Sequence, residues 1–342
     1  MLAGERIRVL VIDDSAVIRQ LVTLALANDP AIEVVGSAVN GSTGLARIAQ
    51  LHPDVILLDV EMPEMDGLEM LRRMRSDPAR PRVLLFSTLT RRGAEVTLDA
   101  LALGADDYVT KSPNAASTEL LPKIKQFFTF PADASHAAPF PPAPRIARAT
   151  RPPEVLAIGV STGGPNALTA ILPQFPRDFP LPILIVQHMP PVFTRSLAER
   201  LQTCTALEVE EATDATPVTA GRILIAPGNH HMRVRRNNGN VMIKLDQSPP
   251  ENSCRPSVDV LFRSVAEVYC GSAVAAVLTG MGQDGTLGAK VLNDAGSYLI
   301  AQDQVTSVVW GMPGSIVASG LADCVVPLDR VVPEILKRLH KK

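Results

Sequence analysis

A proline-rich segment near the middle of this 342-residue chain limits how the chain can fold. Residues 131–153 contain seven prolines and seven alanines, and no glycine. Proline fixes φ and lacks a backbone N–H, so this density of proline excludes a helix interior or a central strand. The composition predicts an extended spacer over residues 129–153, between one domain at residues 6–128 and a second at 154–342. A proline-rich recognition motif is the weaker alternative.

Composition narrows the class of protein. Hydrophobic residues make up 46% of the chain and charged residues 20%, values typical of a globular protein, and no apolar run approaches the roughly 18 residues of a membrane span. The formal net charge of −2 gives no electrostatic basis for a nucleic-acid partner. The four cysteines are widely spaced, without C-x-x-C, and indicate reduced thiols. With no visible signal peptide, we expect a cytoplasmic protein that does not insert into membranes.

The N-terminal domain alternates short apolar runs with amphipathic stretches. Near-continuous runs of Val, Ile and Leu indicate a parallel sheet that is covered on both faces. The pattern predicts a five-stranded, doubly wound α/β domain. Its expected strands are Ile7–Ile12, Ile32–Gly36, Val55–Asp59, Val83–Ser87 and Asp106–Val109.

The same alternation resumes after the spacer and predicts a second doubly wound parallel sheet. Its expected strands are Val155–Ile158, Ile183–Val186, Ala273–Leu278 and Tyr298–Ala301. Residues 222–245 break this rhythm, because apolar runs there are separated by Gly/Asn turns, which predicts a β-hairpin insertion. The runs are Arg222–Ala226, Met232–Arg235 and Val241–Leu245.

Acidic residues follow several strands of the N-terminal domain, at the edge where open parallel sheets carry their sites. Asp13 and Asp14 follow the first strand and Asp59 ends the third. Three carboxylates at one edge would repel one another unless a cation neutralised them, and Mg²⁺ is the hard ion that fits best. Ser87 ends the fourth strand and Lys111 follows the fifth, where an ammonium would stabilise an incoming phosphoryl group.

These motifs resemble response-regulator receiver domains. The likeness rests on Val9–Ser15 and on Asp59–Gly67, and it covers nearly the whole N-terminal domain. The resemblance implies that a histidine kinase transfers a phosphoryl group to Asp59. It also implies that Asp13, Asp14 and Asp59 hold Mg²⁺.

The resemblance assigns three further residues to the phosphate-linked switch. Ser87 and Lys111 would contact the phosphate, and Tyr108 stands where the family carries a mobile aromatic residue. The sequence departs from the family at Ser112, where a cis-proline is usual, since Pro113 follows one place later. This departure concerns loop geometry more than the phosphoryl chemistry.

A Gly-x-Ser-x-Gly pattern centred on Ser161 follows directly on the strand Val155–Ile158. Such a turn lifts the serine hydroxyl above the sheet edge, although a plain strand-to-helix turn can have the same spelling. A serine nucleophile needs a base and a group that orients the base. His188 and Asp284 follow two other strands of the same predicted sheet, so we expect a Ser–His–Asp triad.

Two competing interpretations concern the same domain. His230 and His231 are alternative bases, but they lie beside the predicted hairpin. The stretch Gly280–Gly285 matches G-x-G-x-x-G, with Asp303 about 20 residues on, as in a dinucleotide site. That site is disfavoured because the motif is not at the first βα turn of the domain and because its aspartate, Asp284, would repel a pyrophosphate.

The order Ser…His…Asp differs from that of α/β-hydrolases. With the receiver and the spacer, the motifs of the second domain resemble the chemotaxis protein-glutamate methylesterases (CheB). The motifs are Ile158–Pro165, Gln187–Met189, Arg255–Asp259, Thr279–Gly285, Ala301–Asp303 and Gly311–Gly314.

The resemblance implies a phosphorylation-activated serine hydrolase. Its substrates would be glutamate γ-methyl esters, and glutamines to be deamidated, on the cytoplasmic helices of chemoreceptors. Ser161 would attack, His188 would take the proton and Asp284 would orient the imidazole, with backbone N–H groups near Thr162 and Met281 facing the oxyanion. No cofactor is expected in this domain. The alternative is a receiver-linked serine esterase that acts on a non-receptor substrate.

Overall fold

The computed structural model describes residues 6–75, 77, 79–111, 119–128 and 152–339. Within them the chain forms two compact units, one on each side of the predicted spacer. The spacer itself lies outside the described residues except for its last two, and so does the Ser112–Pro113 position. No helix in the described part is long and apolar enough to cross a membrane.

The N-terminal unit contains the predicted five-stranded parallel sheet, with strand order β2-β1-β3-β4-β5. The fold-class prediction is therefore confirmed for this unit. Its strands are β1 (Ile7–Ile12), β2 (Ile32–Ala38), β3 (Val55–Asp59), β4 (Arg82–Ser87) and β5 (Asp107–Thr110). Its helices are α1 (Ala16–Ala27), α2 (Gly41–Leu51), α3 (Gly67–Met74), α4 (Arg91–Ala102) and α5 (Leu121–Gln126).

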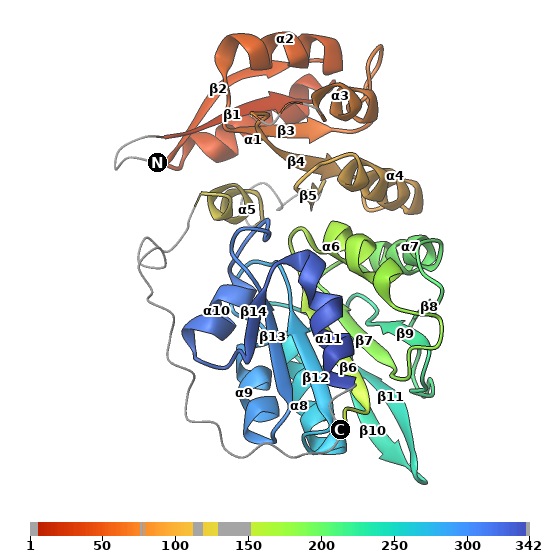
Figure 1. The fold of residues 1–342 in the computed structure, drawn as a ribbon. Coiled ribbons are helices and arrows are strands. Elements are labelled where there is room, and N and C mark those ends of the chain that lie inside the picture. The colour runs from red at the N-terminus through yellow and green to blue at the C-terminus, as the bar shows by residue number, and fades with distance from the viewer. Residues whose placement is uncertain (1–5, 76, 78, 112–118, 129–151, 340–342) are drawn as a thin grey trace. The chain divides into compact units, whose positions relative to one another are not determined.

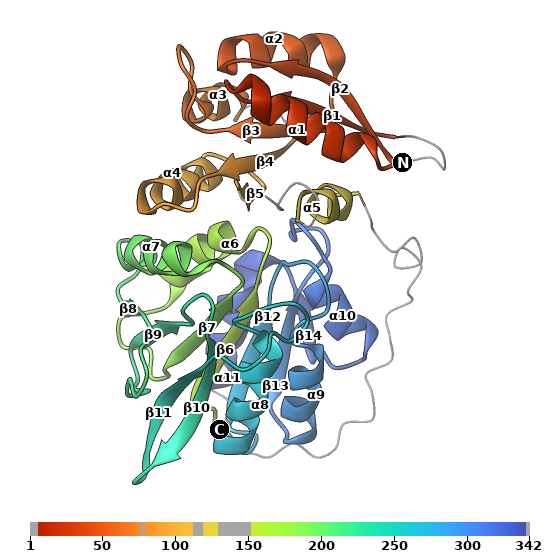
Figure 2. The same cartoon turned by 180° about the vertical axis from the view of Figure 1, so that it is seen from behind.

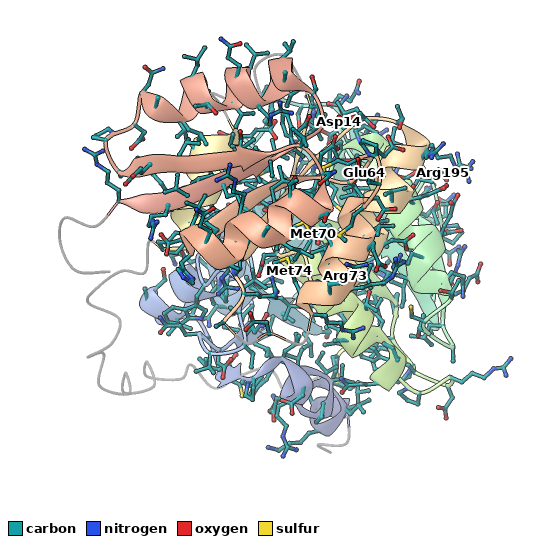
Figure 3. All side chains as sticks on the ribbon, turned by 90° about the horizontal axis from the view of Figure 1, so that it is seen from above. Asp14, Glu64, Met70, Arg73, Met74 and Arg195 are labelled. Carbon is teal, nitrogen blue, oxygen red and sulfur yellow. The ribbon has the colours of Figure 1, made fainter. Side chains whose placement is uncertain are left out.

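Local signals explain where these helices begin. The side chains of Ser15, Asn40, Asp66 and Thr90 each cap a helix by accepting a hydrogen bond from a backbone N–H of its first turn. On α3, Met70 and Met74 lie one turn apart (Figure 3) and both are buried. Helix α1 lies behind the sheet in Figure 1 and in front of it in Figure 2, which turns the view by 180°, so α1 covers one face of the sheet.

The C-terminal unit is built on a seven-stranded parallel sheet with order β14-β13-β12-β6-β7-β9-β8. A separate antiparallel hairpin, β10–β11, projects beyond this sheet (Figure 1). The strands are β6 (Val155–Val160), β7 (Ile183–Gln187), β8 (Glu208–Glu211), β9 (Arg222–Ile225), β10 (His231–Asn237), β11 (Asn240–Asp246), β12 (Ala273–Val277), β13 (Tyr298–Gln302) and β14 (Cys324–Val326).

The sheet differs from the prediction at its edges. The run Arg222–Ala226 forms β9, which pairs in parallel with β7 and β8, so only the last two of the three expected runs form the hairpin. Strands β8 and β14 were not predicted. The sequence of β8 is EVEE and β14 has only three residues, and edge strands of this kind lack the continuous apolar run that marks a buried strand.

Helices cover both faces of this sheet. Helix α8 packs against β6, β12 and the hairpin strand β10 and lies in front of the sheet in Figure 2, whereas α11 lies in front of it in Figure 1. The helices are α6 (Gly164–Ile171), α7 (Pro191–Gln202), α8 (Val258–Tyr269), α9 (Thr286–Asp294), α10 (Met312–Ala318) and α11 (Val331–Leu339), with 3-10 turns at Leu172–Gln174 and Leu328–Arg330. Strand β6 lies between β12 and β7, so the carboxyl ends of these three strands are neighbours.

Candidate functional site

The acidic residues of the N-terminal unit meet at the carboxyl ends of β1 and β3. Lys111 Nζ lies 2.7 Å from Asp59 Oδ2 and 3.1 Å from Asp13 Oδ2. Asp13, Asp14 and Asp59 each offer a carboxylate oxygen, and these three oxygens lie within 4.8 Å of one another. Asp13 and Asp59 are buried, whereas Asp14, labelled in Figure 3, is exposed. The structure therefore brings together the three carboxylates and the lysine that the sequence placed at this edge.

The charges in this pocket are only partly balanced. Burial raises the pKa of the Asp59 carboxyl, and the adjacent ammonium of Lys111 opposes that rise. Burial also opposes the ammonium form of Lys111, but its bonds to Asp59 and Asp13 raise its pKa above the ordinary value. Lys111 thus stays protonated beside the carboxylates. One cation facing three carboxylates leaves excess negative charge, which favours a bound divalent cation.

Ser87 and Tyr108 differ in their position relative to this pocket. Ser87 is buried, and its hydroxyl accepts a 2.6 Å hydrogen bond from Thr97 Oγ1. Tyr108 is also buried, which raises its pKa well above the usual range. Tyr108 is not among the residues that line the described pocket. Those residues are Asp59, Val60, Glu61, Ser87, Thr88, Gly93, Val96 and Lys111.

Ser161 comes directly after β6 and before α6, at the predicted strand-to-helix turn. Gly163 adopts a φ of +78°, which L side chains rarely adopt, and it begins α6. Gly280, from the loop after β12, packs so closely on Ser161 that a Cβ at position 280 would lie 2.8 Å from the Ser161 Cβ. The two glycines thus allow the serine turn and the β12 loop to approach each other.

His188 and Asp284 form a direct pair. His188 Nε2 lies 2.8 Å from Asp284 Oδ2, and the two side chains are only 12% and 2% exposed. Ser161 is linked to this pair through backbone groups. The Gln187 side-chain amide donates hydrogen bonds to the backbone carbonyl oxygens of both Ser161 and His188. Among the described residues, however, no hydrogen bond joins the Ser161 hydroxyl to the His188 ring.

Asp284 lies against the N-terminus of α8. Its carboxylate accepts backbone N–H bonds from Val258 at 2.7 Å and from Asp259 at 3.2 Å. It also accepts a 2.8 Å bond from the Ser257 hydroxyl and a 3.0 Å bond from the Asn252 amide. A helix N-terminus is a favourable place for an anion, so the ionised carboxylate is fixed in one orientation.

These contacts set the protonation states of the pair. Burial works against both charged forms. For Asp284, the bonds from His188 and α8 outweigh burial and hold the pKa of the carboxyl well below its usual range. For His188, the bonds to Asp284 and Cys254 outweigh burial and raise its pKa. The arrangement stabilises an imidazolium, the state that a base reaches after it has taken a proton.

Sequence reasoning missed several residues of this cluster. Ser257 is the N-cap residue of α8. A serine before an amphipathic run indicates the start of a helix, but it does not indicate a contact with Asp284. Asn252 bridges the Asp259 and Asp284 carboxylates. Cys254 Sγ lies 3.6 Å from His188 Nδ1. No local pattern marks these contacts, because the partners are far apart in the sequence.

The histidines that the sequence offered as alternative bases are bonded to groups outside the His188–Asp284 pair. His231 is fully buried, with its ring between the Ser257 N–H and the Pro249 carbonyl. His230 Nδ1 lies 3.2 Å from the Gly228 carbonyl oxygen. In the G-x-G-x-x-G stretch, the aspartate, Asp284, is turned inward to α8, where it fixes the loop.

Comparison with known proteins gives the family. A family model described as CheB methylesterase matches residues 156–335, and one described as response regulator receiver domain matches residues 9–124. A protein-glutamate methylesterase/protein-glutamine glutaminase of Trichodesmium erythraeum is 46% identical, over 98% of this chain and 99% of its own length. A protein of the same name from a Nocardioides species is also 46% identical, over 98% of this chain and 96% of its own.

A solved structure agrees with this result. The CheB methylesterase catalytic domain of Thermotoga maritima is 43% identical and superposes with a TM-score of 0.54. It covers 55% of this chain, and 99% of that domain is matched. The likeness therefore extends over the C-terminal unit, where Ser161, His188 and Asp284 are found.

Proposed function

Because the chain belongs to the CheB methylesterase family, we propose that Ser161, His188 and Asp284 carry out its ester hydrolysis. The protein is a chemotaxis protein-glutamate methylesterase and protein-glutamine glutaminase that is regulated through a receiver domain. We assign the receiver to residues 6–128, the spacer to 129–153 and the catalytic domain to 154–342. The observation that carries the proposal is the His188–Asp284 pair, at the strand end next to Ser161.

The mechanism proceeds by acyl transfer. Ser161 Oγ attacks the γ-carbonyl carbon of the methylated glutamate while His188 takes the hydroxyl proton. His188 then gives this proton to the methoxide oxygen, and methanol leaves. Water attacks the glutamyl–serine ester with His188 again as base, which frees the glutamate. A glutamine side chain that reacts by the same route releases ammonia.

The ring nitrogen of His188 that Asp284 does not contact identifies the proton path. Nε2 is bonded to Asp284, so Nδ1 is the nitrogen available to Ser161. Formation of the Ser161–Nδ1 hydrogen bond then requires a side-chain rotation when substrate binds, since active-site hydrogen bonds often tighten only in the substrate complex. We assign oxyanion stabilisation to the backbone N–H groups of Thr162, which follows the nucleophile, and Met281, which follows Gly280.

In the receiver, we propose that Asp59 accepts the phosphoryl group from a histidine kinase. The residues fit Mg²⁺: the donor set is all carboxylate oxygen, and the three oxygens lie within 4.8 Å of one another beside the ammonium of Lys111. Asp13, Asp14 and Asp59 would hold the ion, which supplies charge neutralisation for the incoming phosphate. Lys111 and Ser87 line the place where phosphate oxygens would lie, and Tyr108 is assigned to the switch by its position on β5.

The substrate assignment is tested with receptor membranes that carry radiolabelled methyl groups. We expect the protein to release labelled methanol, faster in the presence of acetyl phosphate. A generic ester such as p-nitrophenyl acetate serves as comparison, because a serine esterase for another substrate would hydrolyse it and leave the receptor methylated. Methylated receptors lie on the cytoplasmic side, so the proposal also implies a cytoplasmic location.

Asp59→Asn is expected to remove the stimulation by acetyl phosphate. The amide oxygen is a poor nucleophile toward phosphorus, so the ratio of methanol-release rates with and without acetyl phosphate should fall to about one. Chelation of divalent ions should do the same to the unaltered chain. Glu33→Gln is the control, because Glu33 is an exposed side chain on β2 and is not among the residues that line the pocket around Asp59. Stimulation that survives in Asp59→Asn would contradict this assignment.

A further inference from the structure

Cys254 places a thiol at the one ring nitrogen of His188 that Asp284 leaves available. Cys254 Sγ lies 3.6 Å from His188 Nδ1, and the three side chains each offer a ligand atom within 4.8 Å of the other two. Imidazole nitrogen and thiolate sulfur are the donors that zinc prefers. We propose that His188 and Cys254 bind a zinc ion that inhibits the esterase. The inhibitory part rests on the proposed function of His188 as the base.

The spacing of the two donor atoms fits this ion. In a tetrahedral site with Zn–N of about 2.0–2.1 Å and Zn–S of about 2.3 Å, the nitrogen and sulfur are about 3.6 Å apart. The observed separation between Nδ1 and Sγ, 3.6 Å, matches this value. An ordinary contact between a thiol and an imidazole can have the same length. The argument for zinc therefore also depends on the groups that surround His188 and Cys254.

The surroundings of His188 are those of a zinc ligand. Zinc-bound histidines usually donate their other ring N–H to a carboxylate, which fixes the ring and its tautomer. Asp284 supplies this carboxylate at 2.8 Å from Nε2. Its oxygens are also bonded to Ser257, Asn252 and the start of α8, so Asp284 serves better as the orienting group than as a direct ligand.

The thiol is held in place by its own loop. Cys254 and Glu251 exchange two backbone hydrogen bonds, of 2.8 Å and 3.1 Å. Both carboxylate oxygens of Glu251 accept from Arg263 on α8, at 2.6 Å and 2.7 Å. The next residue, Arg255, is bonded to the side chain of Asn229. Cys254 as a residue is half-buried, so it is not fully enclosed in the core.

Binding of the ion and catalysis exclude each other. The Cys254 thiol, and His188 Nδ1 in its imidazolium form, each lose a proton to solvent as the Zn–S and Zn–N bonds form. Nδ1 then has no lone pair with which to accept the Ser161 proton. Water, or Ser161 Oγ, can fill the remaining coordination positions. The predicted result is reversible loss of ester hydrolysis with the nucleophile still in place.

Two measurements on the full-length chain test this proposal. Co²⁺ replaces Zn²⁺ as an optical probe, because a cobalt–thiolate bond gives a near-ultraviolet charge-transfer band that the all-carboxylate receiver site cannot give. We expect the band in the unaltered chain and in Cys270→Ser, the matched control at the C-terminal end of α8, and not in Cys254→Ser. In the second measurement, made without acetyl phosphate, zinc inhibits methanol release and EDTA restores it, with each variant compared with its own metal-free rate.

The outcomes separate clearly. Cys254→Ser should raise the zinc concentration for half-inhibition at least about tenfold, since loss of a group that only orients a ligand already weakens metal binding by about 10–100-fold. Absence of the band from the unaltered chain at millimolar Co²⁺, or its persistence in Cys254→Ser, would overturn the metal site. A band without zinc inhibition would overturn the inhibitory role. Since the band does not depend on any esterase activity, failure of the proposed function would be seen separately, as absent methanol release in metal-free enzyme.

Discussion

Ser161→Ala is expected to abolish methanol release from methylated receptor. The variant removes the only atom that forms the covalent bond to the substrate, and loss of a serine nucleophile lowers kcat by roughly 10⁶-fold in a well-studied serine hydrolase. We expect a decrease of at least about a hundredfold here, where the uncatalysed background limits what can be detected. The measurement is the initial rate of labelled methanol release in the presence of acetyl phosphate.

A serine elsewhere in the catalytic domain is the control for effects of a Ser→Ala substitution that do not depend on the nucleophile. Ser319 is an exposed residue at the end of α10, and Ser319→Ala should retain the rate of the unaltered chain. Phosphorylation of the receiver by labelled acetyl phosphate should be equal in both variants, which shows that the N-terminal unit is intact. Residual activity of Ser161→Ala above about one hundredth would point to a different nucleophile.

Asp284→Asn is expected to lower kcat by about 10⁴-fold, the size of effect seen when a triad carboxylate becomes an amide. The amide keeps the shape of the side chain but removes the charge that stabilises the imidazolium of His188. It also places an N–H₂ group among donors, since Val258, Ser257 and Asn252 all donate to Asp284. The variant therefore loses orientation as well as charge.

The same variant has a distinct pH signature. Asp284 raises the pKa of His188, whereas burial lowers it. Without the carboxylate, the pKa of His188 should fall. A base acts in its deprotonated form, so the acid limb of the kcat/KM profile should move to lower pH even though the maximal rate is smaller. An acid limb that stays where it is would mean that His188 is not the titrating base. Asp294→Asn, in an exposed pair with Lys290 at the end of α9, is the matched control.

Much of this architecture could be predicted because the buried strands of a parallel sheet have a recognisable sequence pattern. Buried strands such as Val155–Val160 are apolar throughout, and the residues that follow them meet at one edge. That rule placed Asp13 near Asp59 and His188 near Asp284 before any coordinates were known. The fold class is confirmed for both units, while the chemical roles of these residues stay predictions.

The residues that escaped prediction did so for a physical reason. Strand β8 alternates glutamates with a valine at a sheet edge, so its pairing depends on β9 and not on its own composition. Cys254 contacts His188 across 66 positions of sequence, and Ser257 contacts Asp284 across 27. Such contacts arise from the packing of α8 on the sheet. A single sequence contains no periodic signal for them.

The contact between Asp284 and the start of α8 has a practical consequence for redesign. Two of the groups that orient this carboxylate are peptide N–H groups, which no side-chain substitution short of proline removes. The side chains of the first turn of α8 are buried as well, so this turn should tolerate little variation in either its backbone or its side chains. Libraries that alter receptor preference should diversify exposed side chains around Ser161 and leave the geometry of the acid–base pair unchanged, provided that α8 keeps its first turn.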